Sequence, residues 1–174
     1  MILGLDASSS CIGWSLLDDQ ENLIDFGYLD LKPFDDLYLK LEFFREFLLE
    51  FEKKYSIDSL KIYIEEPLMM FGKGKSMAQV ISKLQRWNGM ISAVIYSDFE
   101  IKPILINASH ARKLCGVKIN RDSKAKEQVM EFVKNKNIIP EDKWDKKKTG
   151  KLKDYVYDIC DAYIVALAGS KDEQ

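Results

Sequence analysis

Short apolar runs separated by turn residues predict a β-rich beginning of the chain. Apolar residues dominate two stretches near the N-terminus, and a third follows the polar segment Asp18 to Asn22. Runs of this length, bounded by clusters of Ser, Asp and Asn, are typical of strands joined by turns. We therefore expect a three-stranded antiparallel meander made of Ile2–Asp6, Ile12–Leu17 and Leu23–Leu29.

A helical period follows the third strand. Between Asp35 and Tyr55 the apolar residues are spaced by 4, 3, 4 and 3 positions, at Leu37, Leu41, Phe44, Leu48 and Phe51. That spacing lines one face of an α-helix. Similar patterns predict helices over 75–97, 122–136 and 152–168, a strand in KIYIEEPLMMF, and a strand at 101–106 followed by Asn107 or Ser109 as a helix cap. The order βββαβαβαα predicts an α/β fold with one mixed sheet.

Size and composition indicate one globular domain over residues 1–174. The 174 residues are 47% hydrophobic, enough for a real core. We expect an intracellular protein without a membrane partner, because no run of eighteen apolar residues and no basic segment before a long apolar stretch is present. Three widely spaced cysteines and one histidine argue against disulfides and zinc. No organic cofactor is expected.

Basic and acidic residues are segregated along the chain. Residues 111–153 contain 14 Lys or Arg against 6 Asp or Glu, and residues 71–86 contain 4 Lys or Arg and no acid, although the whole chain has a net charge of −2. Such segregation favours an anionic partner. The plainer interpretation is that these lysines only solvate loops and helix faces.

Two predicted strands end in carboxylates. Asp6 closes the first strand, and Glu65 and Glu66 follow the apolar part of the fourth. Ligands of open α/β sheets bind at the carboxyl ends of the strands, so these acids lie where a site is expected. Because successive strand residues point to opposite faces, only one of the two glutamates can face Asp6. The plainer interpretation is a solvated strand end.

The last predicted helix carries three aspartates on one face. Asp154, Asp158 and Asp161 are spaced i, i+4 and i+7, and the row continues into Val165 and Ala168. A helix that is apolar on both sides brings its carboxylates toward the interior, where like charges are costly without a cation. Oxygen donors without nearby His or Cys favour Mg²⁺ or Mn²⁺. Together with the lysine-rich segments, this pattern indicates phosphodiester chemistry.

Five segments of the chain resemble one known family, in the family's order. They are ILGLDASSSCIGWSLLD, IYIEEPLMMFGKGK, QRWNGMISAVIY, INASHARKLCGVK with KAKEQVMEFV, and YDICDAYIVALA. The chain resembles the RuvC-type Holliday junction resolvases of the ribonuclease H-like superfamily, closer to the phage and poxviral branch than to the bacterial one. The resemblance implies a five-stranded mixed sheet, three antiparallel strands then two parallel, flanked by helices.

The family's metal ligands match four acids of this chain. The resemblance implies two Mg²⁺ or Mn²⁺ ions per active site, bound by Asp6, Glu65, Asp158 and Asp161. Glu66 then points away, and Asp154 is at most an accessory acid. In two-metal sites one ion activates the attacking water and the other stabilises the leaving oxygen.

DNA contacts are implied in the same way. Lys126 resembles the family's helix lysine near the scissile phosphate, with an exposed helix lysine as the plainer interpretation. The loop PLMMFGKGKS resembles the loop that enters the junction centre, where Met69, Met70 and Phe71 are wedge candidates or simple core contacts. Further DNA-binding candidates are Ser8, Lys73, Lys75, Lys118 and Lys124.

The resemblance also implies a partner and departs from the family in two places. Family resolvases are homodimers that cut branched DNA into products with 5′-phosphates. The helix over 75–97 carries extra apolar residues, Met77, Ile81, Met90 and Ile95. These residues would lie either in a dimer interface or inside one subunit. The bacterial histidine near the last acidic pair is missing. The longer segment IIPEDKWDKKKTGKLKD forms either an extra DNA-contacting flap or a disordered loop.

Three alternatives to a junction resolvase remain at this point. A ribonuclease H-like nuclease could act on other branched DNA or on RNA–DNA hybrids, and a non-catalytic module could bind junctions without cutting them. The stretch GLDASSSCIG also resembles the phosphate loop of actin-like sugar kinases. That fold needs about twice this length, because its domain is duplicated.

Overall fold

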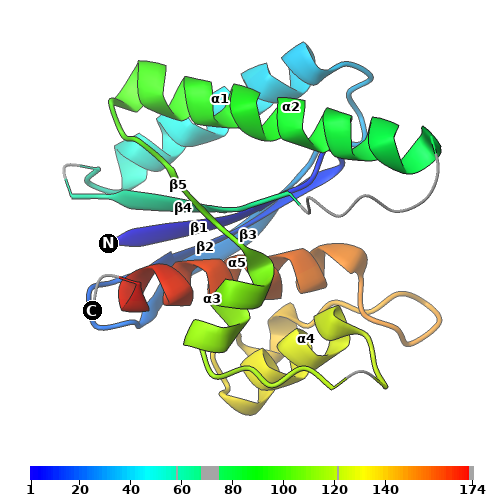
Figure 1. Cartoon of the computed structure of the whole chain (residues 1–174). Helices are drawn as coiled ribbons and strands as arrows, with labels where there is room; N and C mark the ends of the chain where they lie inside the picture. Colours follow the sequence, from blue (N-terminus) through cyan, green and yellow to red (C-terminus); the bar gives the residue numbers. More distant parts are fainter. Residues whose placement is uncertain (58, 68–74, 121, 173–174) are drawn as a thin grey trace.

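Five strands form one mixed sheet in the computed structural model, which describes residues 1–57, 59–67, 75–120 and 122–172 (Figure 1). The strand order is β3-β2-β1-β4-β5. The first two pairings are antiparallel, and β4 pairs in parallel with both β1 and β5. The strands are β1 Ile2–Ala7, β2 Cys11–Leu17, β3 Leu23–Asp30, β4 Lys61–Glu65 and β5 Ile104–Ile106. The predicted α/β fold with three antiparallel strands followed by parallel ones is confirmed.

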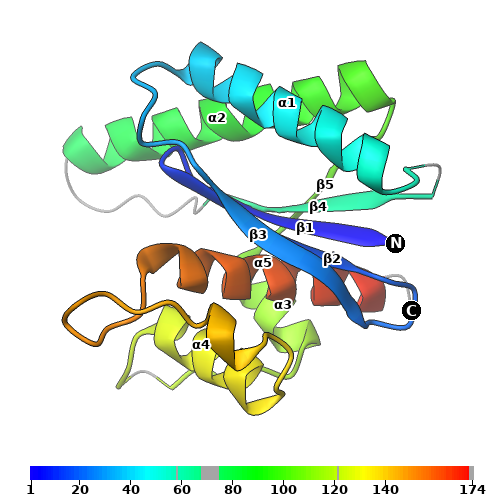
Figure 2. The same ribbon diagram turned by 180° about the vertical axis from the view of Figure 1, so that it is seen from behind.

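Helices cover both faces of the sheet. Helices α1 (Leu37–Lys54) and α2 (Lys75–Phe99) lie on one face, and α5 (Asp154–Lys171) lies on the other (Figures 1 and 2). Two shorter helices, α3 (Ala108–Leu114) and α4 (Ala125–Asn135), pack outside α5. The described helices include none that is both long and apolar enough to cross a membrane.

The alternation along the strands divides the core into two layers. Leu3 and Leu5 of β1 pack with Phe44 of α1 and Trp87 of α2, whereas Ile2 lies in the cluster around α5. The period of two therefore sends odd-numbered side chains of β1 toward α1 and α2 and even-numbered ones toward α5. Asp6 belongs to the even-numbered set.

Glycine at one even-numbered position lets α5 approach the sheet closely. A Cβ on Gly4 would lie 2.3 Å from the carbonyl oxygen of Ala162 and 2.5 Å from the backbone nitrogen of Ala166. Real Cβ atoms do not come this close to backbone atoms, so any side chain there would force α5 away from β1. The small residues on both sides of this contact therefore set the depth at which α5, and its carboxylates, sit.

The ends of several elements differ from the sequence-based expectation. β5 begins at Ile104, so its predicted first three residues are not strand. Helix α3 was missing from the predicted order, although one of the two proposed caps starts it: the Asn107 side chain accepts a hydrogen bond of 2.9 Å from the backbone N–H of Ser109. A seven-residue helix offers too few turns for a periodic pattern to reveal it.

Of the apolar residues of α2 that could form a dimer interface, the structure buries some and leaves others partly exposed. Ile95 is fully buried against the sheet together with Trp87 and Ile91. This residue therefore packs in the core of one subunit and cannot contact a second one. Ile81 and Met90 are partly exposed, and Val80 is 55% exposed. The side chain of Met77 lies outside the described residues. The surface of α2 left for a partner is therefore smaller than the sequence suggested.

Candidate active site

Asp6 and Glu65 lie at neighbouring strand ends and on the same face of the sheet. Gly4 pairs with Tyr63 in the parallel β1–β4 register, so two residues further Asp6 and Glu65 occupy corresponding positions. Tyr63 packs in the core layer around α5, and the strand period sends Glu65 to that layer as well. Glu66 therefore points to the opposite face.

Helix α5 brings two of its three aspartates to this point. The side chains of Asp161 and Asp158 are 4% and 15% exposed, whereas that of Asp154 is 74% exposed and bonds to Lys147 instead. Gly13 makes the approach possible, because it is the β2 partner of Asp6 and a Cβ on it would lie 2.2 Å from the carbonyl oxygen of Asp158. The expectation that this acidic row is buried at its far end is met.

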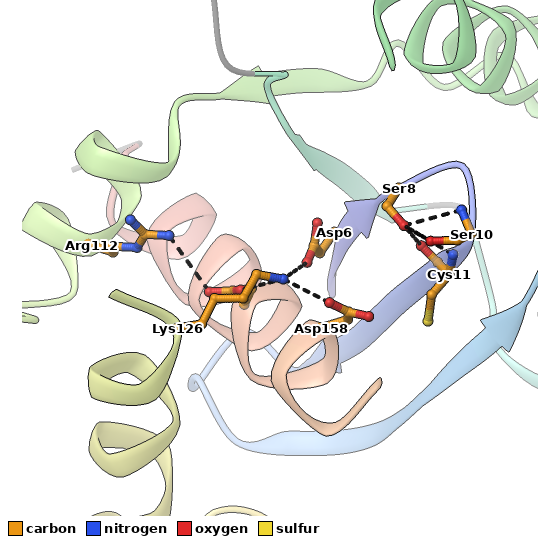
Figure 3. Close-up of polar contacts among 8 residues, drawn as sticks. Asp6, Ser8, Ser10, Cys11, Arg112, Lys126 and Asp158 are labelled. Atoms are coloured by element: carbon orange, nitrogen blue, oxygen red, sulfur yellow. Dashed lines mark hydrogen bonds and ion pairs between the residues drawn. The ribbon is translucent and has the colours of Figure 1, made fainter. Parts of the chain in front are cut away.

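Lys126 of α4 places one ammonium group among three of the carboxylates (Figure 3). Its Nζ lies 2.9 Å from Oδ1 of Asp158, 3.5 Å from Oδ2 of Asp161 and 3.7 Å from Oδ2 of Asp6. The acids thus converge on a common positive charge although they come from a strand and a helix far apart in the sequence. Lys126 is part of the cluster and not merely an exposed helix lysine.

Arg112 of α3 supplies a second cation that the sequence reasoning missed. Its Nη2 lies 3.8 Å from Oδ1 of Asp161, and the arginine side chain is only 17% exposed (Figure 3). Its motif, INASHARKLCGVK, was recognised, but nothing in the spacing singles out this arginine from the neighbouring Lys113. Only the path of α3 across the C-terminal half of α5 brings it to the acids.

Burial raises the pKa values of Asp6, Glu65 and Asp161. Desolvation, with added repulsion from Glu65, raises the pKa of Asp6 well above its ordinary value. Desolvation and repulsion from Asp161 raise the pKa of Glu65 to about 7, and desolvation also raises that of Asp161. Desolvation works against a charged Lys126, yet attraction to Asp6 and Asp158 raises its pKa on balance. The cluster is short of positive charge.

The charge balance suits a divalent cation. Four carboxylates, those of Asp6, Glu65, Asp158 and Asp161, face two cationic side chains, Lys126 and Arg112. The donors are all carboxylate oxygens, the type that Mg²⁺ and Mn²⁺ prefer. Within the described ranges, however, no three Asp, Glu, His or Cys side chains are drawn together closely enough to ligate one ion, and the Lys126 ammonium lies 2.9 Å from Asp158. The donor chemistry therefore fits such an ion, whereas the described side chains are not gathered around a single point as ligands would be.

The serine turn after β1 is held together internally. The Ser8 hydroxyl donates to the carbonyl oxygen of Cys11 at 2.8 Å and accepts from its backbone N–H at 3.0 Å (Figure 3). The ammonium of Lys40, a largely buried residue of α1, donates to the carbonyl oxygen of Ser9 at 2.5 Å. Ser8 thus shapes the strand end beside Asp6, and its predicted role in phosphate binding stays a prediction.

The other predicted DNA contacts are exposed lysines or lie outside the described residues. Lys118 and Lys124 are exposed. Lys118 lines a cavity of about 440 Å³ together with Arg112 and Lys113, and of these three it is Arg112 that forms an ion pair with an acid of the cluster, Asp161. Met69, Met70, Phe71 and Lys73 lie outside the described residues, and Lys75 begins α2 with a side chain that is not described.

Comparison with known proteins supports the fold. No protein-family model matches the sequence, and no curated protein matches it. Several solved structures are similar over most of the chain. RuvC of Thermus thermophilus in complex with a Holliday junction substrate matches with a TM-score of 0.61 at 14% identity, covering 96% of this chain and 90% of that one. A second Thermus thermophilus RuvC structure matches with a TM-score of 0.56 at 15% identity, covering 96% and 91%.

Another similar structure comes from yeast. The yeast mitochondrial Holliday junction resolvase Ydc2 matches with a TM-score of 0.58 at 13% identity, covering 98% of this chain and 77% of that one. At these identities the likeness establishes a fold and not an activity. The chain therefore has a ribonuclease H-like fold of the RuvC type, with four acids and two basic side chains at the carboxyl ends of β1 and β4.

Proposed function

We propose that this protein is a metal-dependent, structure-selective endonuclease that resolves four-way junctions and related branched DNA. The observation that carries the proposal is the convergence of Asp6, Asp158 and Asp161 on one cation at a sheet end, with Glu65 adjoining them. Acids buried with too few counterions destabilise a fold, so their presence needs a functional explanation. Phosphodiester hydrolysis supplies one.

Asp6, Glu65, Asp158 and Asp161 would hold two Mg²⁺ or Mn²⁺ ions. When bound, such ions activate water and stabilise the leaving oxygen of a phosphodiester. The chain's own contribution is to keep the four carboxylates partly dehydrated, which strengthens every charge interaction among them. Lys126 shares the cluster, and its flexible side chain, 54% exposed, can turn from the carboxylates to a phosphate oxygen.

The surroundings of the acids support a polyanionic substrate. Arg112 lies 3.8 Å from Asp161 and shares a cavity with Lys113 and Lys118, so positive charge that can bind a polyanion extends from the acids along α3. One of the similar structures is RuvC in complex with a Holliday junction substrate, and the similarity covers 96% of this chain. We extend that substrate to this chain as part of the proposal, with products that end in 5′-phosphate and 3′-hydroxyl groups.

A homodimer completes the proposal, because two opposed sites suit a substrate with two symmetric cuts. The exposed apolar residues that remain on α2 are compatible with such a contact: Val80 is 55% exposed and Tyr96 61%. The area of α2 available for a dimer contact is limited, because the most buried residues of this helix pack within the subunit.

A panel of labelled DNAs tests the function. Four-way junctions, flaps, plain duplexes and RNA–DNA hybrids are incubated with the protein and Mg²⁺, and resealing of the products by DNA ligase reports 5′-phosphate and 3′-hydroxyl ends. We expect paired nicks near the branch point of the junction, and none with EDTA. Preferential cutting of hybrids, or tight junction binding without cutting in Mg²⁺ or Mn²⁺, would contradict the proposal.

A further inference from the structure

The lysine-rich segment before α5 is an ordered hairpin. Residues 145–153, hereafter the lysine hairpin, contain five lysines and one aspartate. Lys146 and Leu152 form an antiparallel bridge, the backbone N–H of Lys147 donates to the carbonyl oxygen of Lys151 at 2.7 Å, and Gly150 adopts a positive φ of 81° in the turn. The sequence was compatible with either a DNA-contacting flap or a disordered loop. The structure shows an ordered hairpin.

The lysine hairpin is tied to the first turn of α5. Asp145 accepts a hydrogen bond from the Tyr155 hydroxyl, and the Lys153 ammonium lies 3.4 Å from the same carboxylate oxygen. Lys147 reaches over to Asp154, with both carboxylate oxygens within 3.0 Å of its Nζ. Figures 1 and 2 show this loop, coloured orange, projecting from the N-terminal end of α5. Its position is thus defined relative to Asp158, one turn further along α5.

A cavity separates the lysine hairpin from the edge strand β3. It measures about 470 Å³, and Lys32, Lys147 and Lys153 line it together with Tyr28 and Tyr155. Asp158, one of the four acids of the candidate active site, also lines it, so the cavity reaches the edge of that site. Its volume is within the range of small-ligand sites, roughly 300–1,000 Å³, and suits one nucleotide.

Two tyrosines give the cavity an aromatic wall. The rings of Tyr28 on β3 and Tyr155 on α5 are stacked, with centroids 3.8 Å apart and planes 7° apart. Tyr28 is 41% exposed, so its ring keeps surface for a further stacking partner. A rigid aromatic pair beside flexible ammonium groups is the combination that proteins use to bind unpaired nucleotides, since bases stack on the rings while lysines contact the phosphates.

Resting on the proposed function, we propose that this cavity holds an unpaired nucleotide of the DNA strand next to the scissile phosphate, with its base against Tyr28 and its phosphates on the lysine hairpin. A base inside a duplex cannot stack on a protein ring, so the cavity selects DNA whose pairing is interrupted, as at a branch point. Structure selectivity then comes partly from this chain's own hairpin.

The charges around the cavity agree with an exchangeable phosphate site. Lys32, Lys147 and Lys153 are offset there by Asp30, Asp154 and Asp158. Asp158 is already engaged by Lys126 at 2.9 Å, and the Lys147 and Lys153 side chains are 45% and 46% exposed, so both lysines can leave their carboxylates for a phosphate. Such exposed ion pairs contribute little to stability, so replacing a carboxylate by a phosphate as the partner of these lysines costs little free energy.

Photocrosslinking of the full chain tests the position of the strand. A four-way junction carries 5-iododeoxyuridine at single positions within three nucleotides of the branch point, in EDTA so that nothing is cut, and crosslinked peptides are identified by mass spectrometry. We expect crosslinks to Tyr28 or Tyr155, and loss of the Tyr28 crosslink in Tyr28→Leu. Crosslinks confined to other segments, with the junction bound and cut normally with Mg²⁺, would overturn the inference while leaving the nuclease intact.

A charge-matched pair of variants tests the phosphate contacts. For Lys147→Gln/Lys153→Gln we expect junction affinity to fall roughly tenfold and the salt dependence of binding to weaken by about one to two phosphate contacts. Lys53→Gln/Lys102→Gln, which removes two exposed lysines elsewhere, should stay within about twofold of the wild type. Equal losses in both variants would overturn the inference. Absence of any preference for junction over duplex would overturn the proposed function with it.

Discussion

Lys126 on α4 donates a hydrogen bond of 2.9 Å to Asp158 on α5, and its ammonium also lies 3.7 Å from Asp6 on β1. One side chain therefore bridges a strand and two helices at the point where the buried acids meet. It supplies positive charge that a divalent cation would otherwise provide. Replacing Lys126 should therefore show how far repulsion among the acids destabilises the fold and how far a bound ion offsets that repulsion.

We expect Lys126→Met to destabilise the protein in EDTA by about 1 kcal/mol, because three carboxylates lose a shared cation that is 54% exposed and partly screened. Adding Mg²⁺ should raise the unfolding temperature of the variant more than that of the wild type, since an ion that binds the folded state stabilises it. Calorimetry with and without Mg²⁺ measures both effects. Lys124→Met, a control that replaces an exposed lysine on the same turn, should change neither the stability in EDTA nor the response to Mg²⁺. A Lys126→Met variant as stable as the wild type in EDTA would contradict the assigned contact.

The depth of α5 in the sheet depends on Gly13. A Cβ there would lie 2.2 Å from the carbonyl oxygen of Asp158, so we expect Gly13→Ala to lower the free energy of unfolding by about 3 kcal/mol and to impair cutting by displacing Asp158. Gly89→Ala is the matched control, because that glycine lies in α2 with nothing within 4 Å of an added Cβ. It should stabilise the protein by roughly 0.5–1 kcal/mol. Urea unfolding of both variants compares them, and a harmless Gly13→Ala would show that α5 does not press on β2.

Asp25 on the edge strand should make stability depend on pH. Burial works against the charged form, but hydrogen bonds from Lys54 and Tyr55 lower the pKa of its carboxyl on balance. A carboxyl whose pKa is lower in the folded state stabilises the fold above its unfolded pKa of about 3.9, and this contribution disappears as the pH falls through the folded value. We expect Asp25→Asn to cost about 1 kcal/mol at pH 7 and progressively less below about pH 4.

Urea unfolding of the wild type and Asp25→Asn between pH 7 and pH 3 follows this difference. A difference that grows as the pH falls would contradict the assigned direction.

The proposed homodimer is tested by its mass in solution. Light scattering at micromolar concentration should give twice the mass of one chain, about 40 kDa from a chain mass of 20.1 kDa. If α2 forms the contact, Val80→Glu should shift the protein toward monomer, because that side chain is 55% exposed. A wild type that stays monomeric with and without DNA would remove the dimer from the account.

Much of the fold was predictable because it depends on short-range periodicity. The three-stranded meander follows from alternating apolar runs, and the strand period predicts that only one of Glu65 and Glu66 can face Asp6, although the choice of Glu65 came from the family resemblance. The row of Asp158 and Asp161 follows in the same way from helix geometry. These features are local, so one sequence is enough to reveal them.

Features that depend on tertiary contacts were harder to predict. Arg112 reaches Asp161 only through the placement of the short helix α3, and Ile95 is buried because α2 lies flat on the sheet. The lysine hairpin has no apolar pattern of its own, since it is held by backbone bonds and by Asp145. Such contacts join residues whose separation in the sequence carries no period, so pattern analysis cannot find them.

Junction cleavage by Asp6→Asn is the most direct test of the metal-dependent nuclease. Wild-type protein and the variant are compared on a labelled four-way junction for binding in EDTA and for cutting in Mg²⁺. The account predicts near-equal binding and a loss of cutting by at least about 100-fold, because the substitution removes a metal ligand and not a phosphate contact. Cutting by Asp6→Asn at the wild-type rate would contradict it.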